Sequence, residues 1–496
     1  MNKYIKIFFI GSISILSSCD SDFDEINTDP TRADGEIFDP NLILPDALHS
    51  FGTSTTGYNG AVLFESMWVQ VLASTSTGGA NYYSNGDKYV ASGSTNGYTA
   101  SIWNIDYQSA SKFYQMSQLA STKGLTNLAA IGDMLQVMSI GFVTDVYGDA
   151  PYSEALQLED GISQPAYDKQ ENMYPQMLAD LETAILKLNI SGDAPTNDIY
   201  YDGDIAKWRK FGYSLMLKMA MRLVDADAAT AKTYAEKAIA GGVFTSIDDE
   251  AISPTDNPNG FNNENAQAFN VAADLYEVRW SKTMIDFLKS TNDPRLPVVA
   301  EVPPAGLAAN NDISLSGDTD PSIQIGLPNG YDYKEGATDV SLEPDYPGPS
   351  GTGGDVAVIG NYSRPTAIYR DRSAPVFILT YAQIELLLAE AAIRGYNVSS
   401  TASEYYYNGL VGAMETLNKY GGAQIASGDA VTYATANPLD ISSTEASLKM
   451  INEQIWATTG LTGNYIESWN NWKRSDYPVL TPVNYTGNFS MGQIPT

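Results

Sequence analysis

The sequence contains very few of the residues that most enzymes use for catalysis or metal binding. Among its 496 residues there is one cysteine, Cys19, and one histidine, His49. A single cysteine cannot close an internal disulfide, and a thiolate nucleophile needs a basic or histidine-rich setting. A histidine-based metal site, a Ser-His-Asp triad or a Cys-His dyad would all depend on His49 alone. The composition therefore argues against most hydrolase and metalloenzyme mechanisms, and we expect His49 to be a surface or packing residue on an early helix.

Basic residues are also scarce. There are 28 lysines and arginines against 59 aspartates and glutamates, which gives a formal charge of −31. A surface of this sign would repel phosphate backbones, so nucleic acid is excluded as a partner. Aromatic residues, in contrast, make up 11% of the chain and include 32 tyrosines. Since tyrosine and tryptophan combine a flat apolar face with a polar edge, we expect some of these rings to bind ligand.

Recognisable cofactor motifs are missing as well. The glycine-rich stretch GTGGDVAVIG from Gly351 lacks the spacing of a phosphate-binding loop. Acidic clusters such as Asp318 to Asp320 lack the spacing of a cation loop, so we expect no cofactor and leave calcium as an open alternative. A pair of carboxylates acting as glycosidase acid and base remains compatible with the composition, but the sequence does not single out two of them.

The N-terminus has the pattern of an export signal. Lys3 and Lys6 precede a short apolar run from Ile7 to Leu16, which is too short to span a membrane. The next residues complete the stretch Leu16-Ser17-Ser18-Cys19, which resembles a bacterial lipobox. The resemblance implies that Cys19 becomes the lipidated first residue of the mature protein.

These features predict the domain organisation. Residues 1–18 are the lipoprotein signal peptide, 19–35 an acidic tether, and 36–496 a single domain. The acidic run after Cys19 resembles a surface-export signal of lipoproteins in the Bacteroidota. Because we find no later apolar run of the ~18 residues that a span requires, we expect the protein to be anchored to a membrane rather than to cross it.

Helical periodicity dominates the rest of the chain. In LTYAQIELLLAEAAIRGY, Thr380 and Gln383 have the spacing of a capping box and Gly395 is placed to end the helix. Asp204 is a candidate N-cap of a second helix, in which Trp208 lies on the apolar stripe. Further helices are expected over 61–73, 103–120, 125–146, 170–188, 229–240, 283–288, 404–419 and 443–457. We predict a mainly α fold of helix pairs packed like a solenoid.

Between about residues 242 and 374 the composition changes. Proline, glycine, asparagine and aspartate become frequent, as in SPTDNPNGFNNENAQ and EPDYPGPSGTGGD. We expect a loop-rich insertion with a few helical turns, and such a long irregular region in a helical scaffold is more often a functional surface than a defect.

Several landmarks along the chain carry a family resemblance. They are NTDP at Asn27 to Pro30, TDVYGDAPYSEAL at Thr144 to Leu156, PAYDKQENMYPQMLADLETA from Pro165, YYDGDIAKWRKFGYSLMLKMAMRL from Tyr200, NDPRLP at Asn292 to Pro297, IGLPNG at Ile325 to Gly330, LTYAQIELLLAEAAIRGY at Leu379 to Tyr396, and ESWNNWKRSDYPVL from Glu467. In this order, and behind a lipobox, they resemble SusD/RagB-type outer-membrane lipoproteins of the Bacteroidota, in the branch that opens with NTDP. We expect Trp208, Trp469 and Trp472, which lie in these segments, to be core residues.

The resemblance implies a tetratricopeptide-like helical fold and a non-catalytic role. Such a protein captures a nutrient at the cell surface, usually a glycan, and passes it to a SusC-like TonB-dependent transporter. Sugar rings stack on aromatic faces, so the candidate contacts are rings outside the helix stripes. These candidates are Tyr82, Tyr83, Tyr89, Tyr98, Trp103, Tyr276 and Trp280.

Two alternatives stay open at this point. The same scaffold could capture peptides or another oligomeric nutrient, as RagB-type relatives imply, and a lipid-anchored glycoside hydrolase is a more distant alternative. Members of the family also continue through a basic, Tyr-Pro-containing segment where this sequence stops at MGQIPT, which raises the expectation of a truncated C-terminus.

Overall fold

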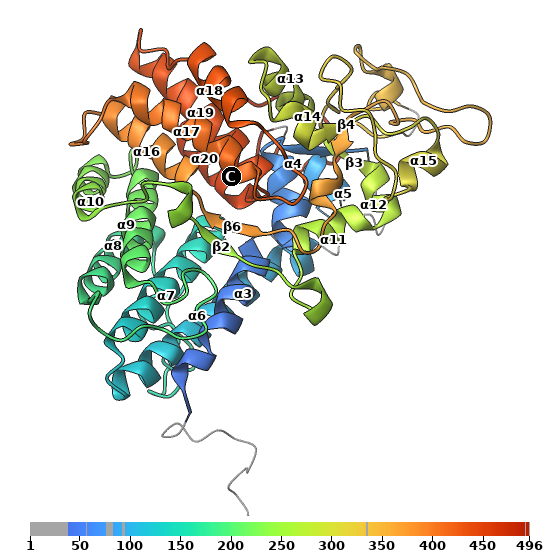
Figure 1. The fold of residues 1–496 in the computed structure, drawn as a ribbon. Coiled ribbons are helices and arrows are strands. Elements are labelled where there is room, and N and C mark those ends of the chain that lie inside the picture. The colour runs from blue at the N-terminus through green and yellow to red at the C-terminus, as the bar shows by residue number, and fades with distance from the viewer. Residues whose placement is uncertain are drawn as a thin grey trace, which may run out of the picture. The chain divides into compact units, whose positions relative to one another are not determined.

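Helices that pack in consecutive pairs make up most of the molecule (Figure 1). The computed structural model describes residues 38–55, 57–75, 83–91, 95–333, 336–491 and 493–495. Residues Met1–Pro40 and Asn41–Thr496 form two separate units, and the helix pairs belong to the second. The predicted succession of helix pairs is confirmed.

The longer helices are α3 (Leu44–Thr55), α6 (Thr95–Thr122), α7 (Thr126–Tyr147), α8 (Gln170–Lys187), α9 (Ile205–Arg222), α10 (Ala228–Gly241), α16 (Tyr381–Ile393), α17 (Ala402–Leu417), α18 (Ser427–Ala436), α19 (Thr444–Leu461) and α20 (Tyr465–Ser475). Helix α6 packs against α7, α9 against α10, α16 against α17, and α19 against α20. Neighbouring pairs lie side by side in Figure 1, as expected of a solenoid.

Local side-chain chemistry explains where these helices begin. Asp204 caps α9 by accepting hydrogen bonds from the N–H groups of Ala206 and Lys207 at 2.8 and 3.2 Å. Thr380 caps α16 by accepting from the N–H of Gln383 at 3.3 Å. The Gln383 side-chain amide donates to Glu467 on α20, at 3.0 Å. The residue that suggested a capping box therefore also joins two helix pairs.

Helix α7 is long and rich in apolar residues. By length and composition it is the one helix among the described residues that could cross a membrane, and 78% of its most apolar window is buried inside the protein. The expectation that no later run would reach spanning length is therefore wrong. Since α7 packs between α6 and α8, its burial matches that of a core helix.

Large aromatic side chains fill the core between the helix pairs. Trp208, Trp456 and Trp469 are at most 2% exposed, and the Trp208 ring packs edge-on against Phe211 with centroids 5.3 Å apart. The predicted core positions of Trp208 and Trp469 are confirmed, while Trp472 is only partly buried. Burying a ring of this size contributes several kcal/mol at ~25 cal/mol per Å2.

A buried group of charges joins three helix pairs. Glu467 on α20 is 1% exposed and forms ion pairs with Lys218 at 3.0 Å and Arg222 at 2.7 Å, both on α9. With Gln383 on α16 these residues form what we call the Glu467 cluster. Burial raises the pKa of Glu467, but the two cations outweigh it and hold that pKa at about 2. The carboxylate is therefore ionised at neutral pH and fully partnered.

The region from 242 to 374 is irregular, as predicted, and lies on the right in Figure 1. It contains the short helices α11 (Glu264–Asn270), α12 (Ala272–Glu277), α13 (Lys282–Ser290), α14 (Leu296–Val299) and α15 (Leu307–Asn311). Three two-stranded antiparallel sheets hold it in place. They pair β1 (Leu72–Ser74) with β3 (Val278–Trp280), β2 (Ala251–Ser253) with β6 (Val376–Leu379), and β4 (Ala300–Glu301) with β5 (Arg364–Pro365).

One predicted element differs clearly from the structure. A helix was expected over 61–73, but the chain forms a π-helix at Tyr58–Glu65 and one turn of α4 (Ser66–Trp68) before strand β1. Gln70 takes a left-handed backbone conformation, with φ of 51°, which ends the helical path. The partner of β1 lies some 200 residues later at β3, so local periodicity could not reveal the strand.

Candidate functional site

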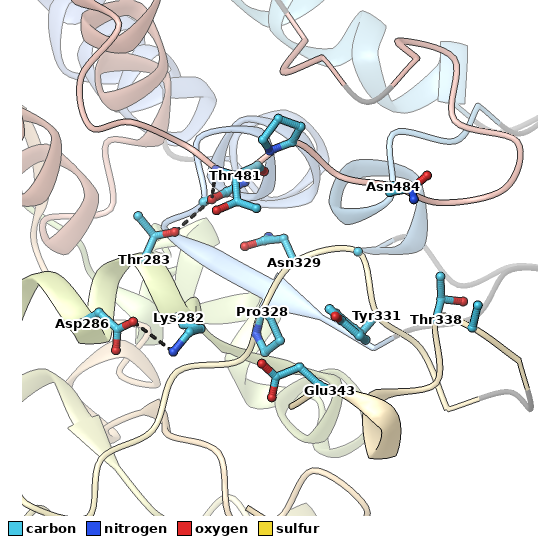
Figure 2. A pocket seen from close by; sticks show the side chains of 14 residues that line it. Lys282, Thr283, Asp286, Pro328, Asn329, Tyr331, Thr338, Glu343, Thr481 and Asn484 are labelled. Carbon is cyan, nitrogen blue, oxygen red and sulfur yellow. Dashed lines mark hydrogen bonds and ion pairs between the residues drawn. The ribbon is translucent and has the colours of Figure 1, made fainter. Parts of the chain in front are cut away.

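A polar cavity of about 450 Å3 opens in the loop-rich region (Figure 2). Four segments far apart in the sequence surround it, and the picture shows the start of α13, the loop at 328–331 and the segment at 481–484 facing one another across it. The lining residues are Gln70, Lys282, Thr283, Asp286, Pro328, Asn329, Gly330, Tyr331, Ala337, Thr338, Glu343, Thr481, Pro482 and Asn484. We call this cavity the polar pocket.

The loop at 328–330 is held by one buried carboxylate. Asp87 accepts hydrogen bonds from the Asn329 side-chain amide at 2.7 Å and from the N–H of Gly330 at 2.8 Å. Asp87 also pairs with Lys88 at 3.2 Å, and both side chains are at most 1% exposed. Because buried, charge-assisted hydrogen bonds fix a loop firmly, this wall is set before any ligand arrives.

Gln70 joins the other two walls. Its side-chain oxygen accepts from the Thr283 hydroxyl at 2.9 Å and from the N–H of Thr481 at 3.2 Å, and its amide donates to the carbonyl of Thr481. One side chain thus connects the start of α13 to the segment around Thr481. Further along that segment, the Tyr485 hydroxyl donates to Asp332 at 2.7 Å.

The charged side chains of the polar pocket gather on one side. Lys282 lies 3.1 Å from Asp286 and 3.4 Å from Asp345. Burial lowers the pKa of Lys282, but the two carboxylates outweigh it and raise that pKa overall. Glu343 accepts from the N–H of Asp345 at 2.9 Å, and burial raises its pKa. The remaining polar lining consists of amides and hydroxyls, which are neutral at every physiological pH.

Tyrosines stand beside the polar pocket in a small cluster of their own. Tyr331 lines the cavity, and it packs with Tyr276 and Tyr346 against a small buried cluster that includes Val340 and Tyr362. The Tyr276 hydroxyl accepts from the N–H of Val358 at 3.0 Å, and the Tyr346 hydroxyl donates to the Val358 carbonyl at 2.7 Å. These partners fix the rings, which is the condition for a low-entropy stacking surface.

The structure buries three rings that were expected on exposed loops. Tyr83, Tyr89 and Trp280 are 0% exposed. Trp280 belongs to strand β3, donates from its indole nitrogen to the Val299 carbonyl at 2.8 Å and packs against Tyr369. The expected exposure of these three rings is therefore wrong, because strand pairing and core packing place them under the surface. The segment that carries Tyr83 and Tyr89 still contributes to the polar pocket, because it also carries Asp87, whose carboxylate holds the loop at 328–330.

The other predicted contacts have different surroundings. Tyr276 and Tyr98 are partly buried, and Trp103 stacks on Tyr167 with centroids 5.9 Å apart and planes 22° apart. Trp103 lies on α6 and Tyr167 is 65% exposed, so this pair forms a second aromatic surface outside the lining of the polar pocket. Ligand contact by these residues stays a prediction. Tyr82, Cys19 and the NTDP motif lie outside the described residues.

His49 is a partly buried packing residue, as expected. It lies on α3 with its ring edge-on to Phe261, at 4.8 Å between centroids. Burial lowers its pKa. Within the described ranges, no three His, Cys, Asp or Glu side chains are arranged to hold a metal ion. The expectation that no cofactor is needed remains a prediction.

The sequence interpretation missed most of the polar lining. IGLPNG was recognised only as a landmark of the family, although Asn329 and Gly330 in it form a wall of the polar pocket. Gln70, Thr283 and Thr481 carry no local motif. The one usable signal was a Pro-Asn-Gly turn inside a loop-rich region.

Comparisons with known proteins agree with this architecture. A solved structure described as a chitin-binding protein matches with 26% identity and a TM-score of 0.75, covering 92% of each chain. A SusD-like protein labelled Bacteroidetes AC2a matches with 22% identity and a TM-score of 0.73, covering 91% of each chain. A chitin-binding SusD homologue from Flavobacterium johnsoniae has 22% identity and a TM-score of 0.67, over 90% of this chain and 89% of that chain.

A search of the curated proteins returned no match. The SusD-like_2 family model, described as starch-binding and associating with the outer membrane, matches residues 41–496. This range includes every helix pair and every residue of the polar pocket. The chain therefore belongs to the SusD-like family of outer-membrane-associated binding proteins.

Proposed function

We propose that the protein captures a glycan at the outer surface of the cell and passes it to a SusC-like TonB-dependent transporter. The observation that carries this proposal is the polar pocket, in which amides and hydroxyls from four segments converge beside fixed tyrosines. Sugar hydroxyls pair with such groups while the C–H face of a sugar packs on a ring. Family membership supports the same role.

The mode of attachment and the absence of catalysis are part of the proposal. Lipidation of Cys19 would leave the protein tethered to the outer membrane, since more than one acyl chain makes a firm anchor. The protein would bind its glycan without cleaving it and without a cofactor. In support, two solved relatives are described by what they bind and not by a reaction.

A binding screen tests the ligand class. The chain from residue 19 onward, with Cys19→Ser to prevent lipidation, is titrated with starch and chitin oligosaccharides, other polysaccharides and peptide digests, with reducing ends assayed in the same wells. We expect glycan binding without release of reducing ends, unchanged by EDTA. Cleavage would overturn the non-catalytic role, and binding to peptides alone would replace the ligand while keeping the scaffold.

Delivery to a transporter needs its own test. The lipidated protein is to be purified from outer membranes, and any SusC-like transporter that co-purifies with it identified by mass spectrometry. A stable complex supports the hand-over of ligand. A protein that binds glycan but never co-purifies with such a transporter would remain a surface-binding protein only.

A further inference from the structure

The charges around the polar pocket are unequal. Of the charged side chains on its α13 side, Asp286, Glu343 and Asp345 are acidic and Lys282 is basic. Lys282 already lies between two of the carboxylates, at 3.1 and 3.4 Å. Among the lining residues that the structure describes, no other side chain carries a positive charge. An anionic ligand would therefore meet Lys282 as the one cation of this described lining, and Lys282 is already paired with two carboxylates.

Glu343 is the acidic group closest to being enclosed. It is 9% exposed, whereas Asp286 and Asp345 are 58% and 70% exposed in their side chains. Figure 2 shows its carboxylate beside Pro328, and both residues line the polar pocket. Water screens the two exposed carboxylates, but it screens Glu343 much less. A second anion placed beside Glu343 would lose hydration without gaining a partner.

We propose that the polar pocket selects uncharged glycans and rejects anionic ones, such as chains bearing uronate or sulfate groups. This inference rests on the proposed glycan-binding function and narrows its substrate class. The selection is by repulsion. Neutral sugars pair with the side chains of Thr338, Thr481 and Asn484 in the lining, while a carboxylate or sulfate meets uncompensated negative charge. The chain's overall charge of −31 adds a long-range repulsion that salt removes, and the local repulsion persists in salt.

The test compares a neutral glycan with its own anionic derivative. A neutral oligosaccharide that binds is carboxymethylated or sulfated, and both forms are titrated by calorimetry at pH 7.5 and at high salt. We expect the anionic form to bind at least tenfold more weakly, which corresponds to about 1.4 kcal/mol. Equal affinities at high salt would overturn the inference while leaving the glycan-binding function intact.

Two substitutions should move the selectivity in opposite directions. Glu343→Gln removes the enclosed negative charge and should raise the ratio of anionic to neutral affinity severalfold. Lys282→Gln removes the single cation and should lower that ratio. The control Glu159→Gln removes a negative charge from an exposed residue outside the lining, and should leave the ratio unchanged.

The outcomes separate the two levels of the proposal. A control ratio that moves as far as that of Glu343→Gln would show that overall charge, and not the polar pocket, sets the selectivity. Ratios that move in the same direction in both pocket variants would overturn the assignment of the repulsion to Glu343. If no glycan of either form binds, the proposed function fails and this inference fails with it.

Discussion

Two groups of charged side chains in this molecule have opposite surroundings. In the Glu467 cluster the carboxylate is 1% exposed and both of its cations are at most 11% exposed. At the polar pocket, Lys282 is 43% exposed, and its partner Asp286 is 58% exposed. The first group is closed and joins helices, and its charges balance once Asp145, 2.9 Å from Arg222, is counted. The second group is open and carries excess negative charge. The same kinds of charged side chain therefore stabilise the fold in the helical region and select the ligand in the loop-rich region.

The largest expected effect comes from disrupting the Glu467 cluster. Glu467→Ala leaves Lys218 buried without its carboxylate partner and Arg222 with Asp145 alone, so we expect a loss of about 3–5 kcal/mol in the free energy of unfolding. Urea denaturation at pH 7 measures it. The control Asp225→Ala removes a 69% exposed carboxylate near Arg394 and should cost under about 0.5 kcal/mol. Similar losses in both variants would contradict the comparison.

The same cluster predicts a pH dependence. The pKa of Glu467 is about 2 in the folded state, below the ordinary value of 4.5. Its contribution to stability is therefore present above pH 4.5 and is lost as the pH falls toward 2.

A buried carboxylate with weaker compensation should behave in the opposite way. Glu65 is 3% exposed, and within the described part of the chain its Oε2 atom has no hydrogen-bond partner. Burial raises its pKa from 4.5 to about 7, and Lys473 opposes this only in part. The contribution of this group is greatest below pH 4.5 and is lost as the pH rises through 7.

Substitution of Glu65 tests that difference. Glu65→Gln should stabilise the protein by about 3 kcal/mol at pH 8 and have little effect near pH 4.5. Denaturation curves at both pH values decide the question. A stabilisation of equal size at both would show that packing, and not the charge, is responsible.

A smaller effect is expected from substitution of Gln70, which connects two walls of the polar pocket. Gln70→Ala removes the hydrogen bonds to Thr283 and Thr481, so we expect a stability loss of about 1–2 kcal/mol. Because the walls of the pocket then separate, glycan affinity should fall at least tenfold. The matched control is Gln176→Ala, on the exposed face of α8, where the amide donates to Asp180 at 2.9 Å. Unchanged affinity in Gln70→Ala would show that the pocket walls hold without this residue.

The smallest effect is expected at a surface ion pair of the helical region. Lys112 lies 2.6 Å from Asp46, and their side chains are 35% and 62% exposed. Solvent screening and side-chain entropy leave such a pair with little net value. Lys112→Ala should change the free energy of unfolding by less than about 0.5 kcal/mol, measured by urea denaturation. A loss above 1 kcal/mol would mean that exposed charge also stabilises this region.

The helical region could be predicted from sequence, and the loop-rich region could not be predicted in detail. Thr380 and Asp204 are N-cap residues that mark the starts of their helices in the sequence, and Trp208 belongs to a row of apolar residues at helical spacing. Trp280 looked like a loop residue because its burial depends on pairing between β3 and β1. Local patterns record the neighbours along the chain, and these two strands are distant in sequence.

The candidate site shows the same limit. The sequence predicted Tyr276 as a ligand contact, and this residue lies in the tyrosine cluster beside the polar pocket, where its contact with ligand stays a prediction. It gave no sign that Gln70 and Thr481 would meet, because neither residue belongs to a motif. Their contact is a property of the complete fold.

The bond between Gln70 and Thr481 spans 411 positions of the sequence. Contacts of such separation form late, since the entropy of closing a long loop is lost before they add stability. During refolding from denaturant, helix signals should therefore recover before ligand binding does. Recovery of glycan binding would then report that folding is complete. The helix signal alone would overestimate the fraction of protein that is able to bind ligand.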